Sequence, residues 1–286
     1  MNKITTTICI CGAGTMGSGI AQVSAQSGFD TILFDVNEVV LEKAKTSIQK
    51  NLQYLVDKEK NSAEEKENIY NRIKFVKDIN DCKANVIIEA ILEKPDAKVS
   101  LFNQLAEINN TETIFATNTS SLSISDIQKN IVNPQRVVGM HFFNPAYLMK
   151  LIEVVKGEQT DNEVAQTIYD LCKQMGKSPV ICKDAPGFIV NRVARHYYLE
   201  AMKIVEQGIA TFENVDAIME ASGFKMGPFK LMDLIGIDIN LSVSQSMYDA
   251  FNHTERFKPS SLQIEKVKNG NLGRKTGGGF YKYSEP

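Results

Sequence analysis

Short runs of β-branched and apolar residues alternate with longer amphipathic stretches over the first two-thirds of the chain. This alternation is typical of parallel strands joined by crossover helices. The runs interpreted as strands are Ile4–Cys11, Thr31–Asp35, Ile73–Val76, Asn85–Ala90, Thr113–Thr117, Arg136–Phe143, Leu151–Val155 and Pro179–Cys182. Little room for a helix precedes Leu151–Val155, so we expect this run to join the sheet antiparallel.

A long helical stretch, about residues 38–72, separates the second run from the third. It is rich in Lys and Glu and is broken near Asn61-Ser62, where Ser62 and Glu65 form a capping-box pattern that restarts a helix. A crossover needs only one short helix, so the stretch indicates an inserted helical hairpin. Two interpretations stay open: a solvated, salt-bridged pair of helices, or an arm that faces a ligand.

The strand pattern stops after Asp184-Ala185-Pro186. Pro186 suits the first turn of a helix. The residues from about 187 to 270 are interpreted as helices separated at Gly208, Gly223, Gly227-Pro228 and Gly236. We therefore place a domain boundary near residue 184, between a sheet domain of residues 1–184 and a helical domain of residues 185–286.

Composition narrows the class of protein. The 286 residues carry 32 basic and 34 acidic side chains, a formal net charge of −2, which argues against a nucleic-acid-binding surface. The sequence shows neither a membrane-spanning run nor a signal peptide after Met1-Asn2-Lys3. The five cysteines (Cys9, Cys11, Cys82, Cys172 and Cys182) lack the spacing of disulfide scaffolds or metal sites. We expect a reduced cytoplasmic protein without a metal.

A glycine-rich segment follows the first predicted strand. It reads Gly12-Ala13-Gly14-Thr15-Met16-Gly17 and opens a helical pattern over Ser18–Ser27. The second strand ends in Asp35, 18 residues beyond Gly17. Together these features form the dinucleotide-binding fingerprint, with Asp35 placed for the ribose hydroxyls. Because a carboxylate repels a 2′-phosphate, we predict NAD(H) over NADP(H). The expected fold is α/β: a Rossmann-type NAD-binding domain with an inserted helical hairpin, followed by an all-α C-terminal domain.

His141 is the candidate acid/base among three histidines. It lies at the carboxyl end of a predicted strand, the edge of an open α/β sheet where ligands bind. Glu153 lies among four apolar residues of the next run and would be costly to bury ionised without a partner. Pairing with His141 would satisfy both side chains and fix the imidazole tautomer. The alternative is that Glu153 points to solvent.

Several motifs, in order along nearly the whole chain, resemble those of the 3-hydroxyacyl-CoA dehydrogenases. Besides Gly12–Gly17 they are Asn118-Thr119-Ser120-Ser121, Met140-His141-Phe142-Phe143-Asn144-Pro145, Leu151-Ile152-Glu153-Val154-Val155, Pro186-Gly187-Phe188-Ile189-Val190-Asn191-Arg192, Gly227-Pro228-Phe229 with Met232-Asp233, and Lys275-Thr276-Gly277-Gly278-Gly279-Phe280-Tyr281. The compact length resembles the bacterial members that act on 3-hydroxybutyryl-CoA.

The resemblance implies roles for individual residues. His141 would be the acid/base and Glu153 its orienting partner, with Ser120 and Asn191 around the substrate oxygen and the nicotinamide. Ser120 would thus touch both cofactor and acyl-CoA, although from the residues alone it could be a turn or helix-cap residue. The further cofactor contacts implied are Glu93, Lys98, Asn144 and Lys275. The CoA contacts implied on the hairpin are Asn51 and Lys58, with Lys50 beside them, although Glu59, Glu64, Glu65 and Glu67 make its tip acidic.

The leading hypothesis is NAD(H)-linked interconversion of short-chain (S)-3-hydroxyacyl-CoA and 3-ketoacyl-CoA, above all 3-hydroxybutyryl-CoA and acetoacetyl-CoA. The resemblance also implies a place in fatty acid and butanoate metabolism and a homodimer through the C-terminal domain. Two alternatives use the same architecture: a dehydrogenase of a free 3-hydroxy or sugar acid, and a non-catalytic, crystallin-like NAD-binding protein.

Overall fold

The computed structural model describes residues 6–284 of the chain. Ile4 and Thr5 of the first predicted strand lie outside the described residues, as do Met1–Lys3, on which the expected absence of a signal peptide rests. The chain divides into two compact units, Met1–Ala185 and Pro186–Pro286.

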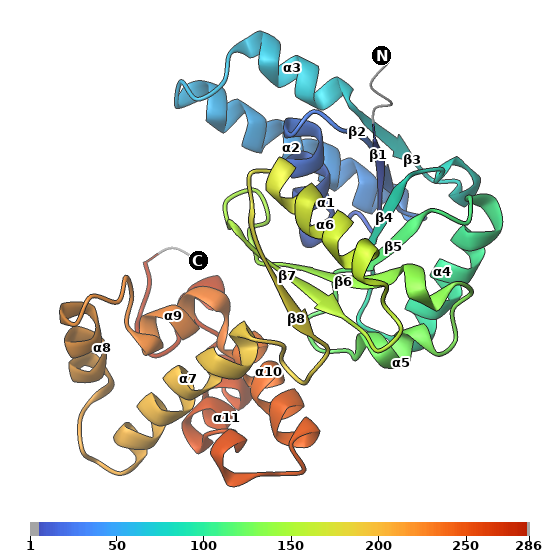
Figure 1. The fold of residues 1–286 in the computed structure, drawn as a ribbon. Coiled ribbons are helices and arrows are strands. Elements are labelled where there is room, and N and C mark those ends of the chain that lie inside the picture. Colours follow the sequence, from blue (N-terminus) through green and yellow to red (C-terminus); the bar gives the residue numbers. More distant parts are fainter. Residues whose placement is uncertain (1–5, 285–286) are drawn as a thin grey trace. The chain divides into compact units, whose positions relative to one another are not determined.

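Among the described residues, eight strands form one sheet in the first unit (Figure 1), in the spatial order β3-β2-β1-β4-β5-β6-β7-β8. They are β1 (Thr7–Cys11), β2 (Asp30–Phe34), β3 (Ile73–Val76), β4 (Val86–Glu89), β5 (Ile114–Thr117), β6 (Val137–Phe142), β7 (Leu151–Lys156) and β8 (Ser178–Lys183). Every predicted run overlaps one of these strands. The β6–β7 pair is antiparallel, as expected, and the other pairs are parallel.

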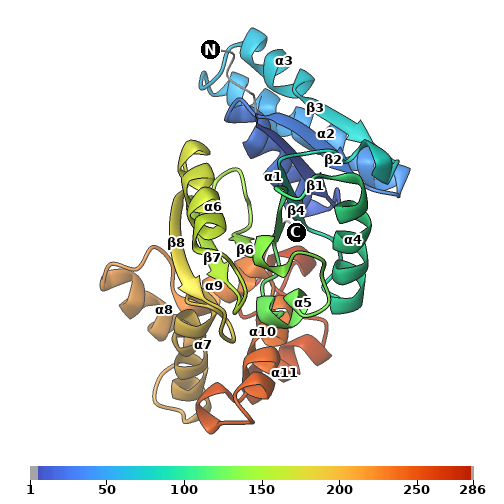
Figure 2. The same ribbon diagram turned by 45° about the vertical axis from the view of Figure 1, so that its right-hand side comes forward.

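Helices cover both faces of this sheet (Figure 2). On one face, α1 (Thr15–Gln26) and α6 (Asn162–Gln174) share a buried core with strand residues such as Ile10 and Ile88. On the other face, α4 (Pro95–Ile108) places Phe102 against Phe115 of β5, with ring centroids 5.4 Å apart. The short helix α5 (Ile124–Gln128) packs beside β6 on this second face. Strands covered on both sides explain the nearly continuous apolar runs in the sequence.

The inserted hairpin consists of α2 (Glu38–Asp57) and α3 (Ala63–Asn71). α2 buries Leu41, Ala44, Ile48 and Leu52, which belong to the same core as α1. The predicted capping box is confirmed: the Glu65 backbone N–H donates to Ser62 Oγ over 3.0 Å, and the Ser62 N–H donates to Glu65 Oε2 over 2.6 Å. These bonds satisfy two N–H groups that the start of a helix leaves unpaired, which is why the chain restarts a helix here.

The second unit is helical, with α7 (Val190–Glu206), α8 (Phe212–Ala221), α9 (Pro228–Ile235), α10 (Ile237–Ala250) and α11 (Ser261–Lys268). Its core contains Met202, Phe229 and Met232, all inaccessible to solvent. The C-terminal segment is tied to α9 because Asp233 accepts hydrogen bonds from the backbone N–H groups of Phe280 and Tyr281, each over 2.9 Å. Short 3₁₀ turns complete the described chain at Ile79–Asp81, Pro134–Arg136, Glu255–Phe257 and Arg274–Thr276.

The expectation that Pro186 opens the first helix of this unit is wrong, because α7 begins only at Val190. Gly187 and Phe188 adopt left-handed backbone conformations, with φ of +71° and +46°. A right-handed helix cannot run through two such residues. Asn191 therefore lies in the first turn of α7.

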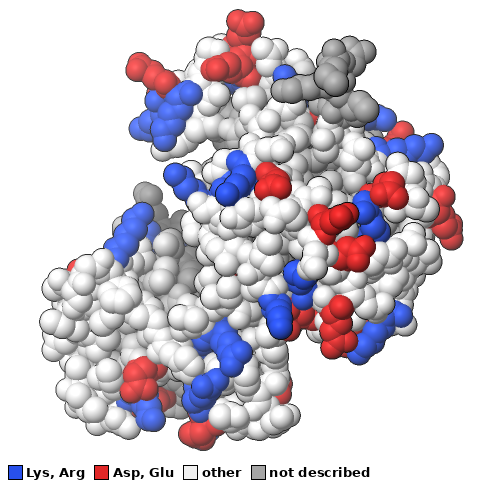
Figure 3. All heavy atoms as spheres, in the orientation of Figure 1, with Lys and Arg blue, Asp and Glu red and all other residues white. Residues whose placement is uncertain are grey.

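Acidic and basic side chains are interspersed on the surface. On the face drawn in Figure 3, both signs occur on each unit and at the free end of the helical hairpin. None of the helices within residues 6–284 combines the length and apolar character needed to cross a bilayer.

Candidate active site

The turn between β1 and α1 shows why glycine stands at each fingerprint position. Gly12 has φ +101°, and a Cβ there would lie 2.6 Å from the Ala90 carbonyl oxygen. A Cβ on Gly17 would lie 1.7 Å from the Gly12 carbonyl oxygen, so the close approach of α1 to the turn requires glycine. Gly14 differs, since nothing lies within 4 Å of a Cβ built on it. The open space beside Gly14 is where a bound group can approach the backbone.

The start of α1 offers N–H donors to such a group. Gly14 is the N-cap, it makes no side-chain cap bond, and the first turn has no acidic residue. A cavity of about 440 Å³ opens here, between the glycine-rich turn, helix α2 and the segment after β6. Its lining includes Gly14, Thr15, Lys43, Asn51 and Asn144. A helix N-terminus with N–H donors and a nearby ammonium group suits a pyrophosphate.

Asp35 follows β2 at the same edge of the sheet. Its carboxylate accepts hydrogen bonds from the backbone N–H groups of Ala13 and Asn37, each over 2.9 Å. The carboxylate is thereby fixed beside the glycine-rich turn. An acidic side chain at this position of a Rossmann unit is suited to bind ribose hydroxyls, so the residues present fit a dinucleotide.

His141 and Glu153 lie directly opposite each other in the β6–β7 register. His141 Nδ1 and Glu153 Oε2 are 2.8 Å apart, and both side chains are buried. The alternative in which Glu153 points to solvent is therefore wrong. A carboxylate hydrogen-bonded to Nδ1 favours the imidazole tautomer that carries its proton on that nitrogen.

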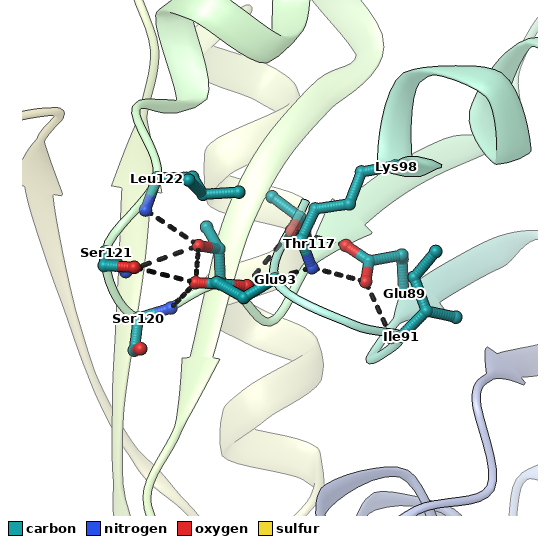
Figure 4. Close-up of polar contacts among 9 residues, drawn as sticks. Glu89, Ile91, Glu93, Lys98, Thr117, Ser120, Ser121 and Leu122 are labelled. Carbon is teal, nitrogen blue, oxygen red and sulfur yellow. Dashed lines mark hydrogen bonds and ion pairs between the residues drawn. The ribbon is translucent and has the colours of Figure 1, made fainter. Parts of the chain in front are cut away.

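Ser120 lies in the loop after β5, and this loop is bound to Glu93 (Figure 4). Glu93 Oε1 accepts hydrogen bonds from the Thr119 hydroxyl, from the Ser120 backbone N–H over 3.1 Å and from the Ser121 hydroxyl over 3.0 Å. Glu93 Oε2 lies 3.1 Å from Lys98 Nζ. Burial raises the pKa of the Glu93 carboxyl, but the Lys98 charge and these hydrogen bonds outweigh it and hold the pKa below its usual value.

The residues implied as CoA contacts lie at different places along the hairpin. Asn51 lines the cavity and donates to Gln22 of α1 over 3.1 Å. Lys50 lines a neighbouring hollow along α2, together with Lys43. Lys58 follows the end of α2, with its Nζ 5.7 Å from the centre of the Tyr54 ring. Sequence reasoning missed Lys43, which lines both spaces, although its helical spacing from Ser47 and Asn51 marks a common face.

Two predicted site residues belong to the helical unit. Asn191 lies in the first turn of α7. Lys275 lies in a 3₁₀ turn near the C-terminus, with its Nζ 2.6 Å from Asp238 Oδ1. Burial raises the pKa of the Asp238 carboxyl, but the hydrogen bond and charge of Lys275 together with backbone hydrogen bonds outweigh it, so the pKa lies below its usual value.

The structure also brings together three buried thiols. The sulfur atoms of Cys9, Cys11 and Cys82 all lie within 4.8 Å of one another, and those of Cys9 and Cys11 are 3.9 Å apart. Hydrogen bonds from Cys11 and then Cys9 lower the pKa of the Cys82 thiol to about 5. Three thiols are a ligand set that soft metal ions prefer. Spacing alone hid this group, because Cys82 is far from the others in the sequence.

A mostly parallel sheet with a glycine-rich turn, an acidic residue after β2 and a buried His–Glu pair at the same sheet edge defines a Rossmann-type NAD-dependent oxidoreductase. The chain belongs to the 3-hydroxyacyl-CoA dehydrogenase family. Residues 7–185 match the family's NAD-binding domain and residues 187–283 match its C-terminal domain. The family match confirms the resemblance, the expected fold class and NAD as the cofactor.

Individual relatives extend over most of the chain. A 3-hydroxyadipyl-CoA dehydrogenase of Escherichia coli is 45% identical over 97% of this chain, which spans 59% of that protein. A probable 3-hydroxybutyryl-CoA dehydrogenase of Deinococcus radiodurans is 40% identical over 96% of this chain and 99% of its own length. The crystal structure of the (S)-3-hydroxybutyryl-CoA dehydrogenase of Ralstonia eutropha has a TM-score of 0.93 and 37% identity, covering 98% of this chain and all of its own.

Proposed function

We propose that this protein interconverts short-chain (S)-3-hydroxyacyl-CoA and 3-ketoacyl-CoA with NAD(H), and that its main substrate pair is 3-hydroxybutyryl-CoA and acetoacetyl-CoA. The observation that carries the proposal is the buried His141–Glu153 pair at the carboxyl edge of the sheet, where the dinucleotide turn also lies. The family match and the 3-hydroxybutyryl-CoA dehydrogenases among the relatives support the substrate class.

The chain's own groups divide the chemistry between them. The nicotinamide, when bound, supplies or accepts the hydride. In the reductive direction the oxygen at C3 gains negative charge, and His141 donates a proton to it through Nε2. Glu153 keeps Nδ1 protonated and favours the imidazolium that forms in the oxidative direction, when His141 takes the hydroxyl proton.

Other residues would bind and polarise the reactants. The Ser120 hydroxyl and the Asn191 amide would donate hydrogen bonds to oxygen atoms that become more negative during reduction. Gly12 to Gly17 and Asp35 would bind the dinucleotide, with Glu93, Lys98, Asn144 and Lys275 as further cofactor contacts. Lys50, Asn51 and Lys58 would face the CoA moiety. The helical unit would form a homodimer.

Turnover with acetoacetyl-CoA tests the function. We expect NADH oxidation with acetoacetyl-CoA and little with free acetoacetate or sugar acids. The substitution His141→Gln is expected to reduce kcat by about 10²–10⁴-fold, the usual contribution of a positioned acid/base, while NADH binding persists.

A matched control is His253→Gln, since His253 is an exposed residue paired with Asp249. This variant should keep the parental rate. Near-normal turnover in His141→Gln would overturn the acid/base assignment. NADH binding without turnover of any 3-ketoacyl-CoA would favour the non-catalytic, crystallin-like alternative. Faster turnover of a free 3-hydroxy or sugar acid, or of its keto form, would favour a dehydrogenase of free acids.

A further inference from the structure

A second carboxylate, Glu89, lies behind the Ser120 loop and is fully buried at the end of β4. Its Oε1 lies 2.6 Å from Lys98 Nζ and accepts the Ile91 backbone N–H over 2.7 Å. Its Oε2 accepts the Thr117 hydroxyl over 2.7 Å. Three donors on two oxygens is the pattern of an ionised carboxylate. Burial raises the pKa of this carboxyl, and the Lys98 charge opposes that effect.

Lys98 connects Glu89 to Glu93. Its side chain enters from α4 and is 1% exposed, and its ammonium lies between the two carboxylates, 2.6 Å from Glu89 and 3.1 Å from Glu93 (Figure 4). A buried ammonium needs a fixed partner. Glu89 is anchored to the sheet, because it ends β4 and accepts hydrogen bonds from Ile91 and from Thr117 of β5. The other donors to Glu93 all belong to the Ser120 loop. Glu93 itself sits in a loop and is about one-third exposed. The position of Glu93 therefore depends on where Glu89 holds Lys98.

Each carboxylate oxygen of Glu89 is connected to the loop that carries Ser120 by a series of polar interactions. In the first series, Lys98 pairs with Glu93, which accepts hydrogen bonds from Thr119, Ser120 and Ser121. In the second series, the Thr117 hydroxyl donates to Glu89 and accepts a hydrogen bond from the Thr119 backbone N–H over 3.3 Å. In turn the Thr119 hydroxyl accepts the backbone N–H of Leu122 over 2.9 Å. Both series of interactions therefore connect the Ser120 loop to the same buried carboxylate, that of Glu89.

Stability alone does not account for this arrangement. A buried ion pair costs desolvation, and apolar residues of similar size are often as stable or more stable in its place. The Glu89–Lys98 pair instead fixes a position, because the Glu89 carboxylate is held by β4 and β5 and determines where the ammonium group of the flexible Lys98 side chain lies. Misplacement of a catalytic group by about 1 Å costs on the order of 100-fold in rate.

We propose that Glu89 is a positioning residue of this enzyme, which acts through Lys98 on Glu93 and thereby on the Ser120 loop. The proposal rests on the proposed function, in which Glu93 contacts the cofactor and Ser120 contacts the substrate. Glu89 itself is fully buried and would contact neither the cofactor nor the substrate.

A kinetic double-mutant cycle tests whether Glu89 acts through Glu93. The variants are Glu89→Gln, Glu93→Gln and the double substitution, each assayed for kcat/KM with acetoacetyl-CoA and for the NADH dissociation constant by fluorescence. We expect Glu89→Gln to lower kcat/KM about 10–100-fold and Glu93→Gln at least as much. The double variant should match Glu93→Gln within about twofold, because residues in one network are not additive. A merely structural loss would instead multiply with the Glu93→Gln loss.

Two controls keep the outcome interpretable. Glu220→Gln removes one partner of the Lys230–Glu220 ion pair in the helical unit and should leave kcat/KM unchanged. Thr117→Val removes the hydrogen bonds that connect Glu89 to Thr119 and leaves the buried Glu89–Lys98 ion pair in place. We expect it to lower kcat/KM several-fold. It is the variant to use should Glu89→Gln fail to fold.

Losses that multiply in the double variant, or Glu89→Gln and Thr117→Val rates within twofold of the parent, would overturn the proposal. A parent chain that binds NADH without reducing acetoacetyl-CoA would instead overturn the proposed function. In that case the cycle on the NADH dissociation constant still tests whether Glu89 positions Glu93.

Discussion

The Asp35 carboxylate is held in place by the protein itself. It accepts hydrogen bonds from two backbone N–H groups, one of them that of Ala13 in the glycine-rich turn. Each of its oxygens retains further acceptor capacity. The same side chain can therefore fix the turn and receive ribose hydroxyls. A 2′-phosphate in that place would meet a fixed negative charge.

Asp35→Asn tests this basis of cofactor choice. The amide keeps the shape and one acceptor oxygen but removes the repulsion, so the ratio of kcat/KM for NADH to that for NADPH should fall about 10–100-fold, which corresponds to about 1.4–2.8 kcal/mol. The measurement is initial-rate kinetics with both cofactors. Asp30→Asn, at the opposite end of β2, should leave the ratio unchanged. An unchanged ratio in Asp35→Asn, or a parent that prefers NADPH, would contradict the prediction.

At the scale of single elements, the hairpin helix α2 combines two tasks. One face carries Leu41, Ala44, Ile48 and Leu52 into the core. Lys43, Ser47 and Asn51 line the cavity beside the glycine-rich turn. The structure thus favours the interpretation of the hairpin as an arm that faces a ligand, with a polar face beside the cofactor turn.

Charge reversal on the arm tests its part in binding CoA. The double substitution Lys50→Glu/Lys58→Glu should raise KM for acetoacetyl-CoA about 10-fold or more, because each charge-assisted hydrogen bond to a phosphate contributes about 1.5–3 kcal/mol. KM for NADH should stay within about twofold. Lys129→Glu is the matched control, since Lys129 is an exposed lysine that directly follows α5 and has Asp126 as its partner. A parental KM for acetoacetyl-CoA would refute the assignment.

At the scale of the whole molecule, the helical unit leaves large apolar side chains exposed. Ile218 of α8 is 63% exposed and Leu234 of α9 is 49% exposed, whereas Phe229 is fully buried in the core of that unit. The large apolar side chains of this unit therefore divide into core and surface positions. The homodimer contact that we propose would cover such side chains of the helical unit.

Light scattering after size exclusion tests the dimer. The 31.8 kDa chain should elute at about twice that mass, as expected for closed two-fold assembly. The double substitution Ile218→Asp/Leu234→Asp should shift the population towards the monomer, because it places charges in an apolar contact. Val132→Asp is the control, since Val132 is an exposed apolar residue of the first unit. A monomeric parent chain would contradict the prediction.

The sequence by itself determined the local features of this protein. The eight strand runs, the capping box at Ser62 and the glycine-rich turn each have a signature within a few neighbouring residues, so pattern and spacing identify them. Local reasoning also has its own errors. It expected a helix at Pro186, because it did not anticipate the left-handed backbone of Gly187 and Phe188.

Only the tertiary structure decided which distant residues meet. The antiparallel register of β6 and β7 places Glu153 on His141 rather than in solvent. The docking of α4 on the sheet brings Lys98 to Glu89. The sulfur atoms of Cys9 and Cys11 in β1 meet that of Cys82, which lies before β4. Such contacts depend on strand order, register and helix docking, which a linear pattern of hydrophobic and polar positions does not contain.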